Sequence, residues 1–252
     1  MSDSAQFENS LEAALQRAAT SPADRPAFYR ELLASRVLII PAEMPDMENG
    51  RIKEGQELKL SALEHEGKQY VPFFTSASRI QGSNPYLELG ARNFLEMTRG
   101  ARLVLNPGAK YGKEFAPEEV EAMLTGRMFE PEAQYEAKKD EQIIIGQPVQ
   151  VPHALLAELS KFFATQDKVK RAWLAWYHQP SREQKPGYLL AIETSKGVDF
   201  RALSGTTGVV LKGAHDGKDY IDIVQYTDNG LSSYFTKQAP FYKASLWRRL
   251  FK

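Results

Sequence analysis

Residues 71–76 read VPFFTS, residues 94–98 read FLEMT and residues 112–119 read GKEFAPEE. The first segment is short, apolar and aromatic, which is typical of a buried strand. The second lies in a helix that we expect over residues 91–98. In the third, Pro117 opens another helix, with two acidic residues at its positive end. Strands and helices therefore alternate here, which predicts an α/β or α+β domain with a mixed sheet.

The residues before this region continue the alternation. Leu11, Leu15 and Ala18 recur at helical spacing, so we expect a first amphipathic helix. Ser21 and Pro22 predict the N-cap and the first position of a second helix. Further strands are expected at 37–40, 63–65, 70–74, 86–89 and 102–105, with a loop at 41–55 and the start of a helix at 76–80.

A second set of elements follows residue 150. Pro152 begins a helix, and residues 169–177 and 188–192 form a predicted hairpin. Residues 200–213 predict another helix and residues 221–224 a strand. The order α-β-β-α-β predicts a compact, plait-like second domain.

The chain length of 252 residues suits two small domains. Residues 126–142 are rich in Glu, Lys and Gln and hold few large apolar side chains, so we place the hinge there. The predicted domains are residues 1–142 and residues 143–252. Residues 143–146 either close the first sheet or open the second.

The net charge is zero, but it is unevenly distributed. Residues 1–150 carry 17 Lys and Arg against 23 Asp and Glu, and residues 151–252 carry 15 against 9. This asymmetry favours either two domains that attract each other or a basic half that meets an acidic partner.

Several classes of site are disfavoured by composition. The absence of cysteine excludes disulfides, thiolate nucleophiles and cysteine metal sites. The histidines are His65, His153, His178 and His215, and no two lie four residues apart, so we expect no metal and no cofactor. The polar N-terminus and the lack of a long apolar run predict a soluble protein without a signal peptide or a membrane span. The absence of cysteine fits the reducing cytoplasm, where we expect the protein to be located.

Three further segments, at residues 18–28, 169–172 and 239–242, complete a pattern with residues 71–76, 94–98 and 112–119. Together they span nearly the whole chain and resemble the SseB family, named for an enhanced serine-sensitivity phenotype in bacteria. The resemblance implies SseB-like N-terminal and C-terminal domains and a link to serine tolerance and amino-acid metabolism. It implies no catalytic residue.

Residues 106–113 form a glycine-containing loop that invites an anion-binding interpretation. Asn106, Lys110, Gly112 and Lys113 would supply backbone N–H groups and positive charge near a helix N-terminus. A nucleotide-binding P-loop needs four residues between its glycines and Ser or Thr after the lysine. Here three residues intervene and Glu114 follows, so a turn between strand and helix is the favoured interpretation.

Phe73, Phe74, Thr75 and Ser76 end a predicted strand, where functional groups gather in α/β folds. Successive side chains point to opposite faces of a strand, so one phenylalanine enters the core. If the other face is uncovered, the second ring joins Thr75, Ser76 and the loop at 106–113 in a binding patch. Core packing of both rings is the favoured interpretation, and the patch is our best candidate for a site.

Three functions remain open. The first is a non-enzymatic protein that binds an unknown protein partner. The second is an amino-acid- or anion-binding protein or an enzyme, with a site near residues 106–113. The third, and least favoured, is nucleic-acid binding through the basic half. The oligomeric state is not predicted.

Overall fold

The computed structural model describes residues 8–48, 51–53, 55–131, 141–181, 185–215, 219–227 and 230–245. The chain divides into two compact units. The N-terminal unit comprises Met1–Thr20 and Pro26–Met128, and the C-terminal unit comprises Ser21–Arg25 and Phe129–Lys252. We predicted the domain boundary after residue 142. Residues 132–140, just before it, lie outside the described residues, so the position of this boundary stays a prediction.

The N-terminal unit is built on a six-stranded mixed sheet, which confirms the predicted architecture. The strand order is β6-β1-β5-β7-β8, and β4 pairs with β5. Strands β5 and β7 are parallel, and the other neighbours are antiparallel. The strands are β1 (Arg36–Ile39), β4 (Leu63–His65), β5 (Lys68–Phe74), β6 (Leu87–Gly90), β7 (Leu103–Leu105) and β8 (Lys113–Phe115).

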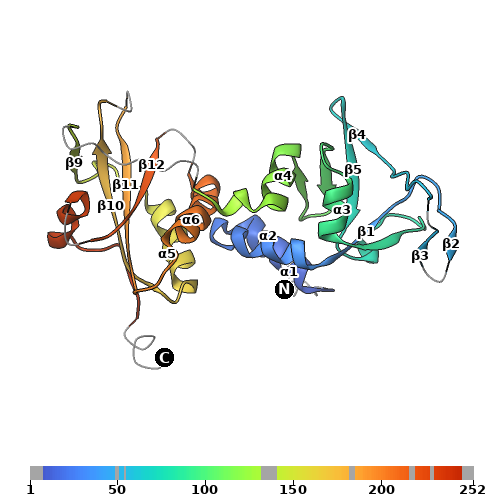
Figure 1. Ribbon diagram of the computed structural model, residues 1–252, viewed down its shortest axis with the longest axis horizontal. Coiled ribbons are helices and arrows are strands. Elements are labelled where there is room, and N and C mark those ends of the chain that lie inside the picture. The colour runs from blue at the N-terminus through green and yellow to red at the C-terminus, as the bar shows by residue number, and fades with distance from the viewer. Residues whose placement is uncertain are drawn as a thin grey trace, which may run out of the picture. The chain divides into compact units, whose positions relative to one another are not determined.

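Helices α1 and α2 precede this sheet, and α3 and α4 lie between or after its strands (Figure 1). Leu11, Leu15 and Ala18 are buried, as their spacing predicted. Ser21 and Pro22 occupy the predicted N-cap and first positions, but of a short 3-10 helix, and the Ser21 hydroxyl donates to Glu158 Oε2 (2.6 Å) and makes no capping hydrogen bond. The elements are α1 (Ser10–Thr20), η1 (Pro22–Asp24), α2 (Arg25–Ala34), η2 (Ala77–Arg79), α3 (Ala91–Met97), α4 (Pro117–Thr125) and η3 (Arg127–Phe129).

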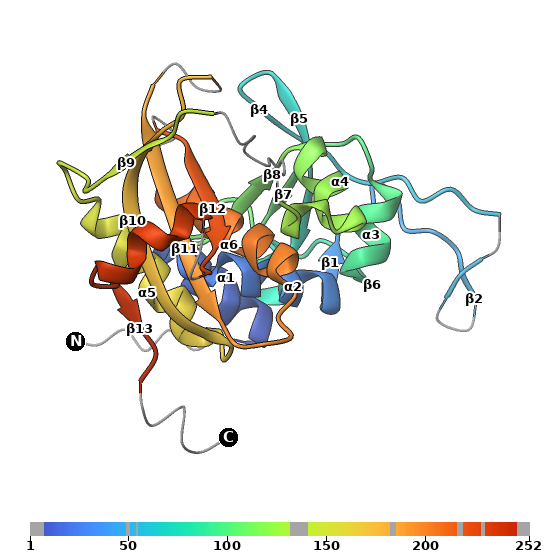
Figure 2. The same ribbon diagram turned by 60° about the vertical axis from the view of Figure 1, so that its left-hand side comes forward.

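The region that we expected to be a loop at 41–55 contains a short hairpin. Strand β2 (Met47–Glu48) pairs antiparallel with β3 (Arg51–Ile52). The base of this excursion is closed by a bridge between Pro41 and Leu60. We call residues 42–59 the arm. Figures 1 and 2 both show the hairpin apart from the six-stranded sheet of its unit.

The C-terminal unit has the predicted order α-β-β-α-β. Its five-stranded sheet has the order β12-β11-β10-β13, and β9 also pairs with β10. Strand β9 therefore opens the second sheet, which settles the alternative that the sequence left open. The elements are β9 (Ile144–Gly146), α5 (His153–Thr165), β10 (Val169–His178), β11 (Gly187–Thr194), α6 (Phe200–Ala214), β12 (Ile221–Gln225), η4 (Gly230–Lys237) and β13 (Tyr242–Lys243).

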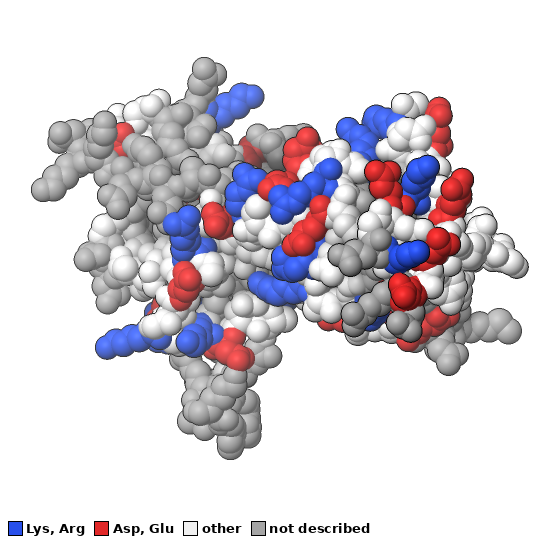
Figure 3. All heavy atoms as spheres, turned by 45° about the vertical axis from the view of Figure 1, so that its right-hand side comes forward, with Lys and Arg blue, Asp and Glu red and all other residues white. Residues whose placement is uncertain are grey.

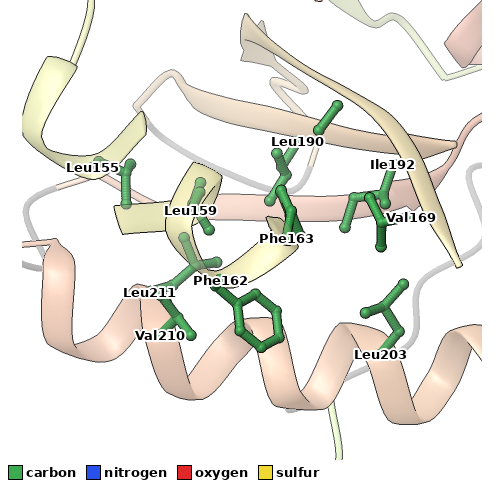
Figure 4. Close-up of a cluster of buried hydrophobic side chains, with 11 residues drawn as sticks. Leu155, Leu159, Phe162, Phe163, Val169, Leu190, Ile192, Leu203, Val210 and Leu211 are labelled. Carbon is green, nitrogen blue, oxygen red and sulfur yellow. The ribbon is translucent and has the colours of Figure 1, made fainter. Parts of the chain in front are cut away.

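Both faces of this second sheet bear apolar clusters. On one face, α5 and α6 pack their apolar sides against β10 and β11, and Figure 4 shows the interleaved side chains. On the other face, Trp173, Tyr177 and Phe235 form the centre of an aromatic cluster. Trp173 stacks on Tyr226 with ring centroids 4.7 Å apart. In the part of the chain that the structure describes, no helix is both long and apolar enough to cross a bilayer.

Candidate functional site

The predicted site residues Thr75 and Ser76 both bond the buried carboxylate of Glu12, and Asn106 joins them through Thr75. Asn9 caps the N-terminus of α1, because its side-chain oxygen accepts the backbone N–H of Glu12 (3.0 Å). Glu12 thus occupies the first turn of a helix, where a negative charge is favoured. The site is therefore assembled from α1, the end of β5 and the start of the loop after β7.

Glu12 is 4% exposed, and its carboxylate is surrounded by donors. Arg79 donates to both oxygens, at 2.8 and 3.0 Å. The hydroxyls of Thr75 (2.8 Å) and Ser76 (2.7 Å) donate to Oε1, and the backbone N–H of Glu8 donates to Oε2 (3.3 Å). A buried charge with a bidentate Arg and this many hydrogen bonds is compensated.

These contacts fix the protonation state of the carboxyl. The hydrogen bond from Arg79 lowers the pKa of Glu12 to about 2, against the opposing effect of burial. The same pair raises the pKa of Arg79. At neutral pH the carboxylate is ionised and its oxygens are occupied by donors. This arrangement suits a structural anchor better than a general base, which needs a pKa near the working pH.

The side chain of Asn106 bonds Thr75, the residue that follows strand β5. Its side-chain oxygen accepts the backbone N–H of Thr75 (2.9 Å), and its amide nitrogen donates to the Thr75 hydroxyl (3.0 Å). The residue has φ +49°, a region that Asn tolerates better than most residues. At Gly112, a Cβ would lie 2.9 Å from the carbonyl oxygens of Leu105 and Asn106, so the loop needs glycine there.

The two lysines of the loop have different surroundings. Lys113 forms an ion pair with Glu119 (2.9 Å) and lies over the ring of Phe115. Lys110 is exposed, with its ammonium 5.4 Å from the centroid of the Tyr111 ring. The loop joins β7 to β8 as a hairpin, whereas we expected it to join a strand to a helix. The sequence prediction missed β8 because two of its three residues are charged.

Phe73 and Phe74 are 0% and 4% exposed, so neither ring contributes to the described surface. The Phe73 ring packs against Phe94 (centroids 5.0 Å apart) and Phe115 (5.8 Å). Both phenylalanines therefore lie in the core, as the core-packing interpretation predicted, and neither ring forms an exposed aromatic patch.

Two open hollows lie on the N-terminal unit. One, of about 370 Å³, is lined chiefly by residues 68–71 and 100–102. The other, of about 520 Å³, is lined chiefly by residues 117–118 and 121–122 with Arg127. Within the described ranges, no group of three or more His, Asp or Glu side chains is placed to hold a metal ion. On the face drawn in Figure 3, the basic and acidic side chains of the described residues are interspersed.

The arm carries exposed apolar side chains that sequence reasoning missed. Met44 is 49% exposed and Met47 is 46% exposed. The arm is held internally by Gln56, whose side chain donates to the carboxylate of Asp46 (2.9 Å) and accepts its backbone N–H (2.8 Å). The dipeptide Asn-Gly at residues 49–50 is a strong hairpin signal and would have predicted this element.

Comparison with known proteins identifies the family. The SseB protein N-terminal domain matches residues 11–122, and the SseB protein C-terminal domain matches residues 137–244. The chain belongs to the SseB family. Protein SseB of Escherichia coli (strain K12) is 33% identical over 245 residues, which cover 94% of this chain and 92% of that protein. Protein SseB of Shigella flexneri matches equally well. No solved structure matches.

Membership of the SseB family confirms the resemblance seen in the sequence and agrees with the two-unit α+β structure. The family description names domains and no reaction.

Proposed function

We propose that this protein acts by binding another protein, as a non-enzymatic regulator in the cytoplasm. The link to serine tolerance and amino-acid metabolism rests on the resemblance to the SseB family. Protein binding rests on the surface itself.

The arm is the observation that carries the proposal. Met44 and Met47 are about half exposed, although an apolar side chain gains free energy when it leaves water. A two-stranded hairpin alone is marginally stable, so the arm gains from a surface to pack against. Methionine is flexible and polarisable and fits partners of varied shape. We infer that an apolar groove on a partner protein receives the two methionines.

The alternative, an amino-acid- or anion-binding protein or enzyme using residues 106–113, has less support. Asn106 is committed to Thr75, and Lys113 is paired with Glu119. Ser76 donates to Glu12. Lys110 is the loop lysine left for a ligand, and one exposed ammonium is a weak anion site.

A complementation experiment tests the proposal. A bacterial strain that lacks its own copy of this gene is grown with excess serine and supplied with the wild type, the double variant Met44→Lys/Met47→Lys, or Met97→Lys. Met97, at the end of α3, is 53% exposed and serves as the matched control. Wild type and Met97→Lys restore growth, and the double variant does not. Full restoration by the double variant at equal abundance contradicts the role of the arm.

A further inference from the structure

The second sheet has one edge that other strands cover and one that they do not. The outer edge of β10 is covered by β9 at one end and by β13 at the other. Strand β12 forms the opposite edge and pairs with β11 alone among the described strands. An uncovered edge presents backbone N–H and C=O groups that seek partners.

The ladder between β11 and β12 shows which backbone groups are free. The strands are parallel, the Tyr188 N–H donates to the Tyr220 carbonyl, and the Tyr226 N–H donates to the Ile192 carbonyl. Residues of even number in this stretch of β12 therefore direct their backbone toward β11. Because the direction alternates along a strand, Ile221, Ile223 and Gln225 direct theirs outward. No described residue bonds these outward groups.

In the sheet of the N-terminal unit, by contrast, a charged side chain bonds the backbone of each edge strand. On β6, the outward carbonyl of Glu88 accepts a hydrogen bond from Arg36 Nη2 (3.2 Å). On β8, the outward carbonyl of Glu114 accepts one from Lys113 Nζ (3.2 Å). Charged side chains on edge strands are a common protection against pairing with another chain. Strand β12 carries one charged side chain, Asp222, but no described side chain donates to the outward carbonyls of Ile221, Ile223 or Gln225, so its edge lacks this kind of cover.

The sequence of β12 is complementary to itself. In an antiparallel pairing of two copies centred on Ile223, each outward residue meets an outward residue. Ile223 then faces its counterpart, and Ile221 faces Gln225 of the second copy, so every outward N–H and C=O finds a partner. On the other face Asp222 lies opposite Val224, so no like charges are directly opposed. Ile221 and Ile223 already pack against the α5–α6 cluster, which the pairing would extend.

We propose that two copies of this protein associate through β12, as a twofold dimer with a continuous sheet of both C-terminal units. Twofold symmetry is the commonest form of homo-oligomer, and it requires a self-complementary surface of this kind. The partner that binds the edge of β12 is thus a second copy of the same chain. The inference goes beyond the proposed function, because it concerns a different unit and does not need the arm.

Sedimentation velocity of the purified full chain, over a roughly hundredfold range of micromolar concentrations, tests the proposal. We expect the mass to rise from that of the 28.4 kDa chain to twice that value. Gln225→Pro removes an outward N–H, and Pro is tolerated on edge strands. By symmetry the dimer loses two hydrogen bonds, so its Kd rises about tenfold or more. Gln225→Thr keeps the N–H and serves as the matched control, with a Kd close to that of the wild type.

A second variant guards against an indirect effect of proline. Ile223→Lys places a charge at the twofold axis and is expected to give a monomer, with an unchanged far-UV circular dichroism spectrum. If the wild type stays monomeric at every concentration tested, the proposal is overturned, even if another protein segment is found to bind this edge. A dimer that survives both Gln225→Pro and Ile223→Lys also overturns it. Met44→Lys/Met47→Lys leaves the dimer intact, so failure of the arm and failure of this edge are distinguishable.

Discussion

Replacing Glu12 by Gln removes the charge on which the N-terminal site is built. The pKa of the Glu12 carboxyl is lowered from 4.5 to about 2 in the folded chain. A difference of about 2.5 units, at 1.36 kcal/mol each, amounts to roughly 3 kcal/mol of stability. Since the folded pKa is the lower one, this contribution is present above about pH 5 and is lost as the pH falls toward 2.

Urea unfolding of wild type and Glu12→Gln at pH values from 7 to about 2.5 measures this contribution. Far-UV circular dichroism is the appropriate signal, because the tryptophans, Trp173, Trp176 and Trp247, all belong to the C-terminal unit. We expect a difference of about 3 kcal/mol in the free energy of unfolding at pH 7, which shrinks toward zero with acid.

The control is Glu88→Gln, which removes a carboxylate paired with Arg36 at 3.0 Å on the surface. Both side chains of that pair are more than half exposed, so we expect a change below about 1 kcal/mol. A difference for Glu12→Gln that stays constant between pH 7 and the acid limit would refute the reasoning, because it would mean that ionisation of Glu12 contributes nothing.

Three further predictions concern the stability of the two units and the small-molecule alternative. Asn106→Ala leaves the Thr75 N–H without a partner and places alanine at positive φ, so urea unfolding is expected to show a loss of about 2–3 kcal/mol. In α6, Gly205→Ala would place a methyl group against the Phe129 carbonyl and lower the thermal midpoint, whereas Gly208→Ala meets nothing within 4 Å and raises stability by about 0.5–1 kcal/mol. A thermal-shift panel of serine and related amino acids is expected to leave the midpoint unchanged, and a saturable rise would support the small-molecule alternative.

The larger elements of the fold could be predicted from the sequence because their signals are local. The helix at 200–213 and the hairpin at 169–192 have long apolar patterns, and the structure places α6, β10 and β11 there. Strand β8 was missed because three residues with two charges resemble a loop. The pairing of β2 with β3 was missed because so few residues carry the pattern, although the dipeptide Asn-Gly at 49–50 is a sequence signal for a hairpin.

The site was predictable only in part. Asn106 does bond Thr75, but Thr75 and Ser76 both bond Glu12, which lies 63 residues before Thr75 in the chain. A contact at that separation leaves no local pattern in a single sequence. The Asn9-x-x-Glu12 spacing is typical of a helix N-terminus and would have placed Glu12 in the first turn, without naming Arg79 as its partner.

Affinity capture of the tagged protein, expressed at native level and washed at low salt, is the most direct test of protein binding through the arm. Mass spectrometry identifies what is retained by wild type, by Met44→Lys/Met47→Lys and by Met97→Lys. We predict one dominant stoichiometric protein that wild type and Met97→Lys retain and the arm variant loses, because charged lysines cannot enter an apolar groove without a large cost. Equal retention of that protein by all three, or no retained protein, contradicts the account.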